Sequence, residues 1–222
     1  MKILALEFSS TQRSAAVVSA DAAKLSLVTS EVLESGSNVN SLALIEEALK
    51  KAALEREQID CVAVGIGPGS YTGIRSAIAL AQGWQLAREC KLIGISSAEC
   101  IAATAQQEGL TGIVDVVIDA QRHEFYLCRY EITAQALKAI EPLRIVTMTE
   151  IQKRKTSDEL AIGPEVTRWF PGGRTVFPRA CILGKIANRR TDFVAGEKLE
   201  PIYLREPNFV KAPPPRFARE GP

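Results

Sequence analysis

The chain has 222 residues, of which 46% are hydrophobic, and its 27 Lys and Arg and 26 Asp and Glu residues leave a formal net charge of +1. This length is enough for one large domain or two small lobes with a sizeable core, and the composition excludes a disordered chain. A net charge near zero excludes a global attraction to nucleic acid or to an anionic membrane, so any RNA contact must be local or supplied by a partner.

The first half of the chain predicts three strands and then an alternation of helices and strands. The expected strands are 3–8, 14–19, 24–29, 61–64 and 92–95, and the expected helices are 38–53, 72–90 and 97–107. Three strands followed by helix–strand alternation is the order of a ribonuclease-H-like lobe.

The second half restarts this plan, because residues 117–120 (VIDA) echo residues 5–8 (ALEF) and each copy places an acid at the end of its first strand. Strands are expected at 113–118, 124–130 and 137–140, helices at 149–155, 165–169 and 178–190, and a chain break at 171–173. We therefore expect an N-terminal lobe at 1–108 and a smaller C-terminal lobe at 109–222, whose proline-rich end, 211–216, is extended and mobile.

The five cysteines are odd in number and widely spaced, and they include no Cys-x-x-Cys pair: Cys61, Cys90, Cys100, Cys128 and Cys181. This spacing argues against a zinc cage and a disulfide framework, and favours buried thiols in a reducing compartment. There is no signal-peptide pattern at the N-terminus and no apolar run of membrane-spanning length. We expect a cytoplasmic protein with no membrane contact.

A glycine-rich run at 64–75 (VGIGPGSYTGIR) joins a strand pattern to the start of a helix pattern. Backbone N–H groups converge on anions at such a turn, and glycine also permits positive φ and the close approach of another backbone. Gly-Lys-Ser/Thr is missing, so the run is neither a Walker A loop nor the regular dinucleotide fingerprint. Phosphate contact and a turn needed only for packing both remain open.

Several runs occur together in the order found in one family: 2–6 (KILAL), 67–75 (GPGSYTGIR), 81–83 (AQG), 93–97 (IGISS), 118–120 (IDA) and 203–205 (YLR). On these residues the chain resembles the TsaB (YeaZ) family of bacterial tRNA threonylcarbamoyladenosine synthesis. The resemblance covers most of the first 130 residues and the Tyr-Leu-Arg near the C-terminus. It implies an α/β, actin/hexokinase-like (ASKHA) fold with duplicated ribonuclease-H-like lobes.

The resemblance also implies a role. Such a chain is a non-catalytic scaffold required for N6-threonylcarbamoylation of the adenosine next to the anticodon in tRNA, and it dimerises with the metal-dependent paralogue TsaD. A TsaE-like ATPase completes the assembly, ATP or ADP with Mg²⁺ binds at a subunit junction rather than tightly to this chain, and a homodimer forms when the partners are absent. Contact with tRNA is expected to be mostly indirect, since the basic clusters, such as 153–155, are short.

Histidine usage argues against an enzyme. The resemblance places the metal-binding His-x-x-x-His of the catalytic paralogue at positions that are Ser97 and Ile101 here, and the single histidine, His123, falls at an expected hairpin tip. Isoleucine cannot ligate a metal and one histidine cannot make that site, so we expect no catalytic residue and no metal site.

Six residues are candidates for lying near a nucleotide: Glu7, Gly67, Gly69, Ser70, Thr72 and Asp119. Glu7 stands where the family usually has Asp, and the family Arg after Asp119 is Gln121 here. A structural role for Glu7 at the strand end and a nucleotide role both remain open. Ser70 and Thr72 lack a nearby base, so helix capping is the better explanation than nucleophilic catalysis.

The two helices 38–53 and 72–90 carry apolar and small residues that the resemblance assigns to partner docking: Leu42, Ile45, Leu49, Ile74, Ala77, Ile78, Ala81 and Trp84. A purely internal core is the alternative. The alternative function is an actin-fold, ATP-dependent small-molecule kinase or ATPase in which Glu7 and Asp119 flank Mg-ATP. A glycoprotease, the older label of the superfamily, is disfavoured by the missing histidines.

Overall fold

The computed structural model describes residues 1–21, 26–36, 39–154 and 160–205. Its first sheet has the strand order β3-β2-β1-β4-β5, in which β1 is antiparallel to β2 and parallel to β4. The strands are β1 (Lys2–Glu7), β2 (Gln12–Asp21), β3 (Ser26–Ser35), β4 (Cys61–Gly65) and β5 (Lys91–Ile95). The expected proline-rich tail at 211–216 lies outside the described residues.

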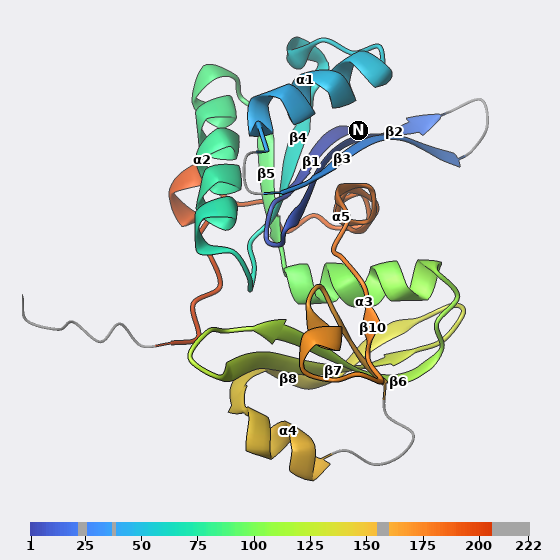
Figure 1. Ribbon diagram of the computed structural model, residues 1–222. Helices are drawn as coiled ribbons and strands as arrows, with labels where there is room; N and C mark the ends of the chain where they lie inside the picture. Colours follow the sequence, from blue (N-terminus) through green and yellow to red (C-terminus); the bar gives the residue numbers. More distant parts are fainter. Residues whose placement is uncertain (22–25, 37–38, 155–159, 206–222) are drawn as a thin grey trace, which may run out of the picture.

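The second sheet repeats the first. Read from its other edge, its order is β8-β7-β6-β9-β10, with β6 antiparallel to β7 and parallel to β9. The strands are β6 (Gly112–Asp119), β7 (Glu124–Ile132), β8 (Leu137–Thr147), β9 (Leu160–Gly163) and β10 (Arg174–Thr175). The same order and the same strand directions in both sheets confirm the duplicated ribonuclease-H-like plan of the actin/hexokinase-like fold (Figure 1).

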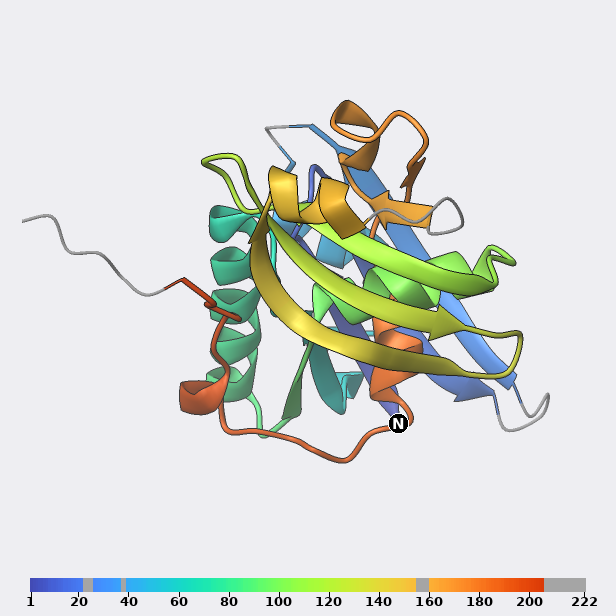
Figure 2. The ribbon, with the colours of Figure 1, turned by 90° about the horizontal axis from the view of Figure 1, so that it is seen from below.

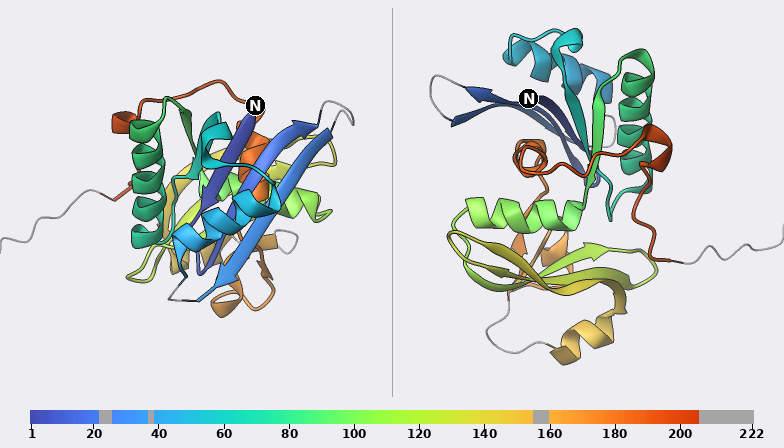
Figure 3. Two further views of the ribbon diagram at one scale, coloured as in Figure 1. Left: turned by 90° about the horizontal axis from the view of Figure 1, so that it is seen from above. Right: turned by 180° about the vertical axis from the view of Figure 1, so that it is seen from behind.

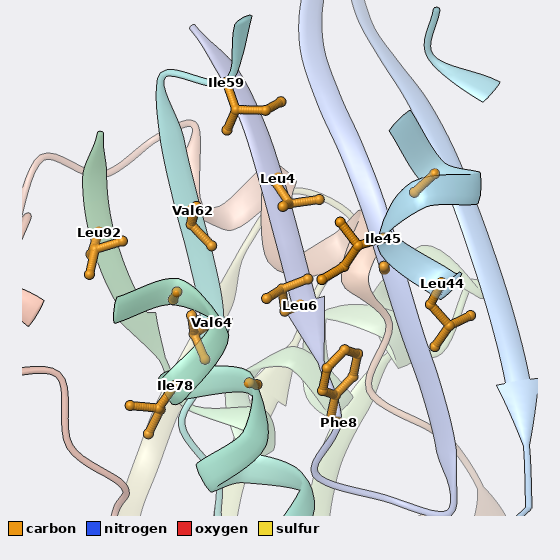
Figure 4. Close-up of a cluster of buried hydrophobic side chains, with 14 of the residues drawn as sticks. Leu4, Leu6, Phe8, Leu44, Ile45, Ile59, Val62, Val64, Ile78 and Leu92 are labelled. Carbon is orange, nitrogen blue, oxygen red and sulfur yellow. The ribbon is translucent and has the colours of Figure 1, made fainter. Parts of the chain in front are cut away.

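Two helices cover one face of the first sheet: α1 (Ser41–Lys51) and α2 (Tyr71–Ala87). Leu4, Leu6 and Val62 point from the strands toward these helices and form one buried cluster with Leu44 and Ile78 (Figure 4). The alternate strand residues face the other side of the sheet, as a fully covered sheet requires. Each helix start is capped by a side chain: Asn40 for α1 and Ser70 for α2.

The two lobes exchange helices. Helix α5 (Ala180–Ala187), which follows the second sheet in sequence, packs on the second face of the first sheet. Helix α3 (Ser97–Gln107) follows the first sheet in sequence but lies on the second sheet, where Ile101 and Ala105 join the core between α3 and that sheet (Figure 3, right). The expected lobe boundary at 108/109 follows the order of the chain, whereas α3 and α5 each pack on the sheet from the other side of that boundary.

The outer face of the second sheet is covered by α4 (Met148–Arg154) and a short 3-10 helix, Val166–Arg168 (Figure 2). The helix expected at 165–169 is thus only a single 3-10 turn. Strands β9 and β10 were not expected, and β8 continues well past residue 140 although Pro142 interrupts its sequence. Proline is tolerated there because β8 is an edge strand and one side of it needs no ladder hydrogen bonds.

A segment without regular strands, residues 191–205, returns from α5 along the edge of the first sheet; we call it the strap (Figure 3, right). Val194 N donates to Leu92 O over 2.9 Å, and Ile202 N donates to Ile66 O over 2.9 Å. Leu199 is buried in the core under α2. Among the helices that the structure describes, none combines the length and the apolar composition needed to cross a bilayer.

Candidate functional site

A cleft of ≈ 710 Å³ lies where segments of both lobes converge. The β1–β2 turn and the start of α2 line it from the first lobe. The end of β6 and the segment after β9 line it from the second lobe, and the strap closes a third side. Its walls comprise residues 9–11, Arg13, Gly36, 69–72, Ile74, 118–121, Tyr126, Pro164, Glu165, Arg168 and 201–203.

The glycine-rich turn is built for close backbone contact. Ser70 N donates to Ser9 O over 2.7 Å, and a Cβ on Gly69, whose φ is +146°, would overlap that same carbonyl. A Cβ on Gly73 would overlap the carbonyl of Phe8 in the same way. Close packing therefore accounts for these glycines without any ligand. Ser70 Oγ accepts from Gly73 N, which confirms its expected capping role.

Glu7 does not face the cleft. Its side chain is fully buried, with Oε1 accepting from Ser9 N over 2.9 Å and Oε2 accepting from the Ser97 hydroxyl over 3.0 Å. The missing side chain of Gly65 leaves the space that the carboxylate fills, because a Cβ there would overlap it. Burial raises the pKa of the Glu7 carboxyl, while the hydrogen bonds from Ser9 and Ser97 oppose that rise. The Glu7 carboxylate thus has a structural role at the strand end in this structure, whereas its proximity to a nucleotide stays a prediction.

Gly67 also lies off the cleft. Its N–H donates to Ser97 Oγ over 3.3 Å, and its carbonyl accepts from Ser97 N over 2.7 Å. Of the six candidates for a nucleotide-proximal position, the structure brings four together in the cleft lining and turns Glu7 and Gly67 inward. The four are Gly69, Ser70, Thr72 and Asp119.

The acids of the cleft come from the second lobe. Asp119 accepts two hydrogen bonds from Gln121, from its backbone N over 2.7 Å and from its side-chain amide over 3.2 Å. Glu165 lies on the same wall, and its pKa is raised first by burial and then by the negative charge of Asp119. With Glu7 turned inward, none of the described first-lobe residues that line the cleft is an acid. The residues of this chain therefore do not fit a Mg-ATP site that needs acids from both strand ends.

Aromatic rings stand at the mouth of the cleft. Tyr71 and Tyr203 are 62% and 56% exposed, and their ring centroids are 6.3 Å apart. The Arg75 guanidinium lies 5.0 Å from the centroid of the Tyr71 ring and donates to its hydroxyl. Sequence reasoning did not place Tyr203 here, nor Glu165, because both reach the cleft from segments more than 70 residues away from α2 along the chain.

The expected docking residues require a correction, because most of them pack inside this chain. Six are buried in the core under α1 and α2: Ile45, Leu49, Ile74, Ala77, Ile78 and Ala81. Buried side chains offer no contact surface to a partner, so the apolar stripe is this chain's own core. Only Leu42, at 57% exposure, and half-buried Trp84 keep a surface. The indole N–H of Trp84 has no hydrogen-bond partner among the residues that the structure describes.

The opposite side of α2 is exposed and almost free of charge. Ala79, Gly83 and Leu86 lie on it, Leu86 being 90% exposed, and a Cβ on Gly83 would meet nothing within 4 Å. Arg75 is the one charged residue of α2. We call Thr72, Arg75, Ala79, Gly83 and Leu86 the outer α2 face.

The two positions matched to the metal-binding histidines lie on α3. Ser97 and Ile101 are both fully buried. Ser97 is hydrogen-bonded to Glu7, and Ile101 lies in the core between α3 and the second sheet. Among the described residues, no group of three or more His, Cys, Asp or Glu side chains has an arrangement that could hold a metal ion. His123 is exposed in the β6–β7 turn, as expected.

Comparison with known proteins agrees with this architecture. Residues 28–201 match the family model described as TsaD: tRNA N6-adenosine threonylcarbamoyltransferase. The tRNA threonylcarbamoyladenosine biosynthesis protein TsaB of Escherichia coli is 27% identical over 185 residues, which cover 74% of this chain and 78% of that protein. TsaB of Bacillus subtilis is 24% identical over 170 residues, covering 75% of this chain and 72% of that protein.

Among solved structures, YeaZ from Pseudomonas aeruginosa superposes with a TM-score of 0.77 at 22% sequence identity, covering 91% of this chain and 99% of that chain. A second Pseudomonas aeruginosa structure, described as similar to peptidase YEAZ, gives a TM-score of 0.76 at 22% identity. These superpositions show the fold, and the family model with the sequence relatives shows the family. The chain therefore belongs to the TsaD family, in its TsaB (YeaZ) branch.

Proposed function

We propose that this chain is a non-catalytic subunit required for threonylcarbamoylation of N6 of the adenosine next to the anticodon in tRNA. It positions a metal-dependent, TsaD-like catalytic paralogue and acts in the cytoplasm. The names of the sequence relatives in Escherichia coli and Bacillus subtilis support the pathway. The five buried free cysteines support a reducing compartment.

The burial of two α3 side chains is the observation that best supports a non-catalytic role. At the two positions matched to the catalytic histidine pair, this chain buries Ser97 against Glu7 and packs Ile101 into the core. Neither side chain is free to turn outward without breaking a hydrogen bond or opening a cavity. The alternative of an ATP-dependent kinase gains nothing from the structure, because Glu7 does not face the cleft.

The outer α2 face supports docking of the paralogue. Small exposed residues such as Ala79 and Gly83 let another helix approach closely, and exposed Leu86 supplies apolar area. On α1, Leu42 is a second exposed apolar side chain. A TsaE-like ATPase would join the same assembly, a homodimer would use the same face when partners are absent, and tRNA contact would be mostly indirect.

A nucleotide, ATP or ADP with Mg²⁺, is proposed only at the junction with the paralogue. The cleft opens beside the start of α2, where Thr72 and the Ser70 hydroxyl lie, and Asp119 lies on its far wall. A partner would have to supply the groups that Glu7 does not. Calorimetry on the isolated chain is therefore expected to show no Mg-ATP binding, whereas the complex binds the nucleotide.

An omission assay tests the proposed function. Unmodified tRNA, threonine, bicarbonate, ATP and the other purified components of the same organism are incubated with and without this chain, and modified adenosine is quantified by mass spectrometry. We expect product only when the chain is present. Equal product without it would overturn the assignment. Leu86→Asp should abolish the stimulation, whereas Ile113→Asp, a similar change at an exposed position of the second lobe, should not.

A further inference from the structure

The β6–β7 turn at the cleft wall is strained. Three consecutive non-glycine residues, Gln121, Arg122 and His123, have φ angles of 63°, 59° and 61°. Side chains crowd the backbone in this left-handed region, and runs of such residues are rare outside ligand clamps and switch regions. The strained residues immediately follow Asp119 and Ala120, which line the cleft.

Hydrogen bonds on both flanks hold the turn. Within it, Ala120 N donates to Glu124 O over 3.0 Å and Glu124 N donates to Gln121 O over 3.1 Å. From outside the turn, the Nη2 amino group of Arg205 donates a hydrogen bond to Ala120 O over 3.1 Å and another to the Glu124 carboxylate. Arg205 therefore clamps the residues on either side of the strained segment.

Arg205 ends the strap, and Gly196, earlier in the strap, is tied to α2. Gln82 Nε2 donates to Gly196 O over 2.7 Å, and Gly196 N donates to Gln85 Oε1 over 2.7 Å. Between these ties, Ile202 is anchored to Ile66, and Pro201, Ile202 and Tyr203 line the cleft. One continuous segment thus touches the strained turn, the cleft and the side of α2 that adjoins its outer face.

We propose that the strap and the turn 121–123 form a latch that couples the cleft to α2. In the closed state, Arg205 holds the turn in its left-handed form. It also fixes the end of the strap to the second lobe, while Gly196 fixes an earlier part of the strap to α2. In the open state, Arg205 is released, the turn relaxes, and the strap loosens as far as α2. An occupant of the cleft that contacts Tyr203 or Asp119 shifts this equilibrium, and a partner on α2 shifts it reciprocally. The latch is a property of this chain alone and goes beyond the proposed function.

Amide hydrogen exchange on the full chain tests the latch. Arg205→Ala should accelerate exchange by about tenfold or more both at Glu124 and at the distant amides of Ile202 and Gly196, since a relay opens as one cooperative unit. Trypsin cleavage after Arg122 should rise in parallel. Arg174→Ala is the matched control, because Arg174 forms an ion pair with Glu108 at comparable exposure and does not touch the strap.

A rescue variant separates strain from simple loss of a contact. Glycine adopts positive φ at little cost, so adding His123→Gly to Arg205→Ala should restore slow exchange at Glu124. If Arg205→Ala does not fold, Arg205→Lys, which keeps one charge but loses the planar fork, replaces it in both measurements. Acceleration confined to the turn, uniform acceleration that includes β1, or no acceleration would each overturn the latch.

Discussion

The Ser97 hydroxyl donates to Glu7 Oε2 over 3.0 Å and so joins the start of α3 to the end of β1. The same hydroxyl oxygen accepts from Gly67 N, so three strand-to-helix or strand-to-turn junctions meet at one buried side chain. The Glu7 carboxylate lies at a strand end, where an actin-like fold would place an acid near its ligand. In this protein it accepts hydrogen bonds from buried groups of the interior instead.

Replacing Glu7 by Gln should change how stability depends on pH. Burial raises the pKa of Glu7 in the folded chain above its ordinary value of 4.5, so the folded state binds this proton more tightly than the unfolded state does. The free energy of unfolding therefore falls as pH rises from the unfolded pKa to the folded one. Glu7→Gln removes this loss, so the variant's stability relative to the parent should increase with pH across that window.

Urea unfolding of both proteins over this pH range measures that difference. Glu7→Asp is the companion variant, because the shorter side chain retains the charge but loses the bond to Ser97, at an expected cost of about 1–3 kcal/mol. A stability difference between Glu7→Gln and the parent that stays constant with pH would contradict the raised pKa.

Two glycines of α2 should respond oppositely to alanine. Gly73→Ala forces a Cβ against the Phe8 carbonyl and should destabilise the chain by about 1–3 kcal/mol. Gly83→Ala meets empty space in the helix interior and should stabilise the chain by about 0.5–1 kcal/mol. Thermal melts measure both effects. Because Gly83 lies on the outer α2 face, the more stable variant should nevertheless bind the catalytic paralogue more weakly in a titration.

Neighbouring alanines on α2 distinguish the core from the docking surface. Ala81→Asp buries an unpaired charge at a site with no exposure and should cost about 4 kcal/mol or more, so that little folded protein remains. Ala79→Asp is exposed and should leave the melting temperature within a few degrees of the parent while abolishing binding to the paralogue. Unchanged binding by Ala79→Asp would rule out the outer α2 face as the interface.

Two ion pairs, one in each lobe, differ in their expected contribution to stability. Arg129 is mostly buried between Asp115 and Glu141, and its side chain is only 14% exposed. Arg129→Ala removes the cation that pairs with the largely buried Asp115 carboxylate, whose side chain is 11% exposed, and should cost about 3–5 kcal/mol. Arg56→Ala, which breaks the exposed pair with Glu46, should cost less than about 1 kcal/mol. Chemical denaturation of both variants checks the ranking.

Hydrophobic periodicity predicted most elements of this fold, because α1, α2 and α3 have continuous apolar faces and β1 and β6 repeat one pattern with an acid at the tip. It missed β9 and β10, of four and two residues, since segments so short carry too little pattern. The apolar stripe of α2 was found, but which way it faces depends on the sheet beneath it. Periodicity alone cannot tell a helix's own core from a partner's.

The site was predictable only where one local segment supplies it. The glycine-rich turn predicted Gly69, Ser70 and Thr72 as site residues, because their spacing and chemistry can be read within a few residues of sequence. The sequence left two roles open for Glu7, since the direction of its side chain is set by the space above Gly65, a residue on another strand. Glu165 comes from a segment that is distant in sequence and has no motif of its own.

The exchange of α3 and α5 has a consequence for synthesis on the ribosome. When residues 1–95 have emerged, the face of the first sheet that includes Ile3, Ala5 and Ile93 still lacks α5, the helix that packs on it, because α5 is translated only after the whole second sheet. We therefore expect the first lobe to complete its core only after α5 has been synthesised. Nascent chains that end before residue 180 should expose this face and be held by chaperones until the last helix arrives.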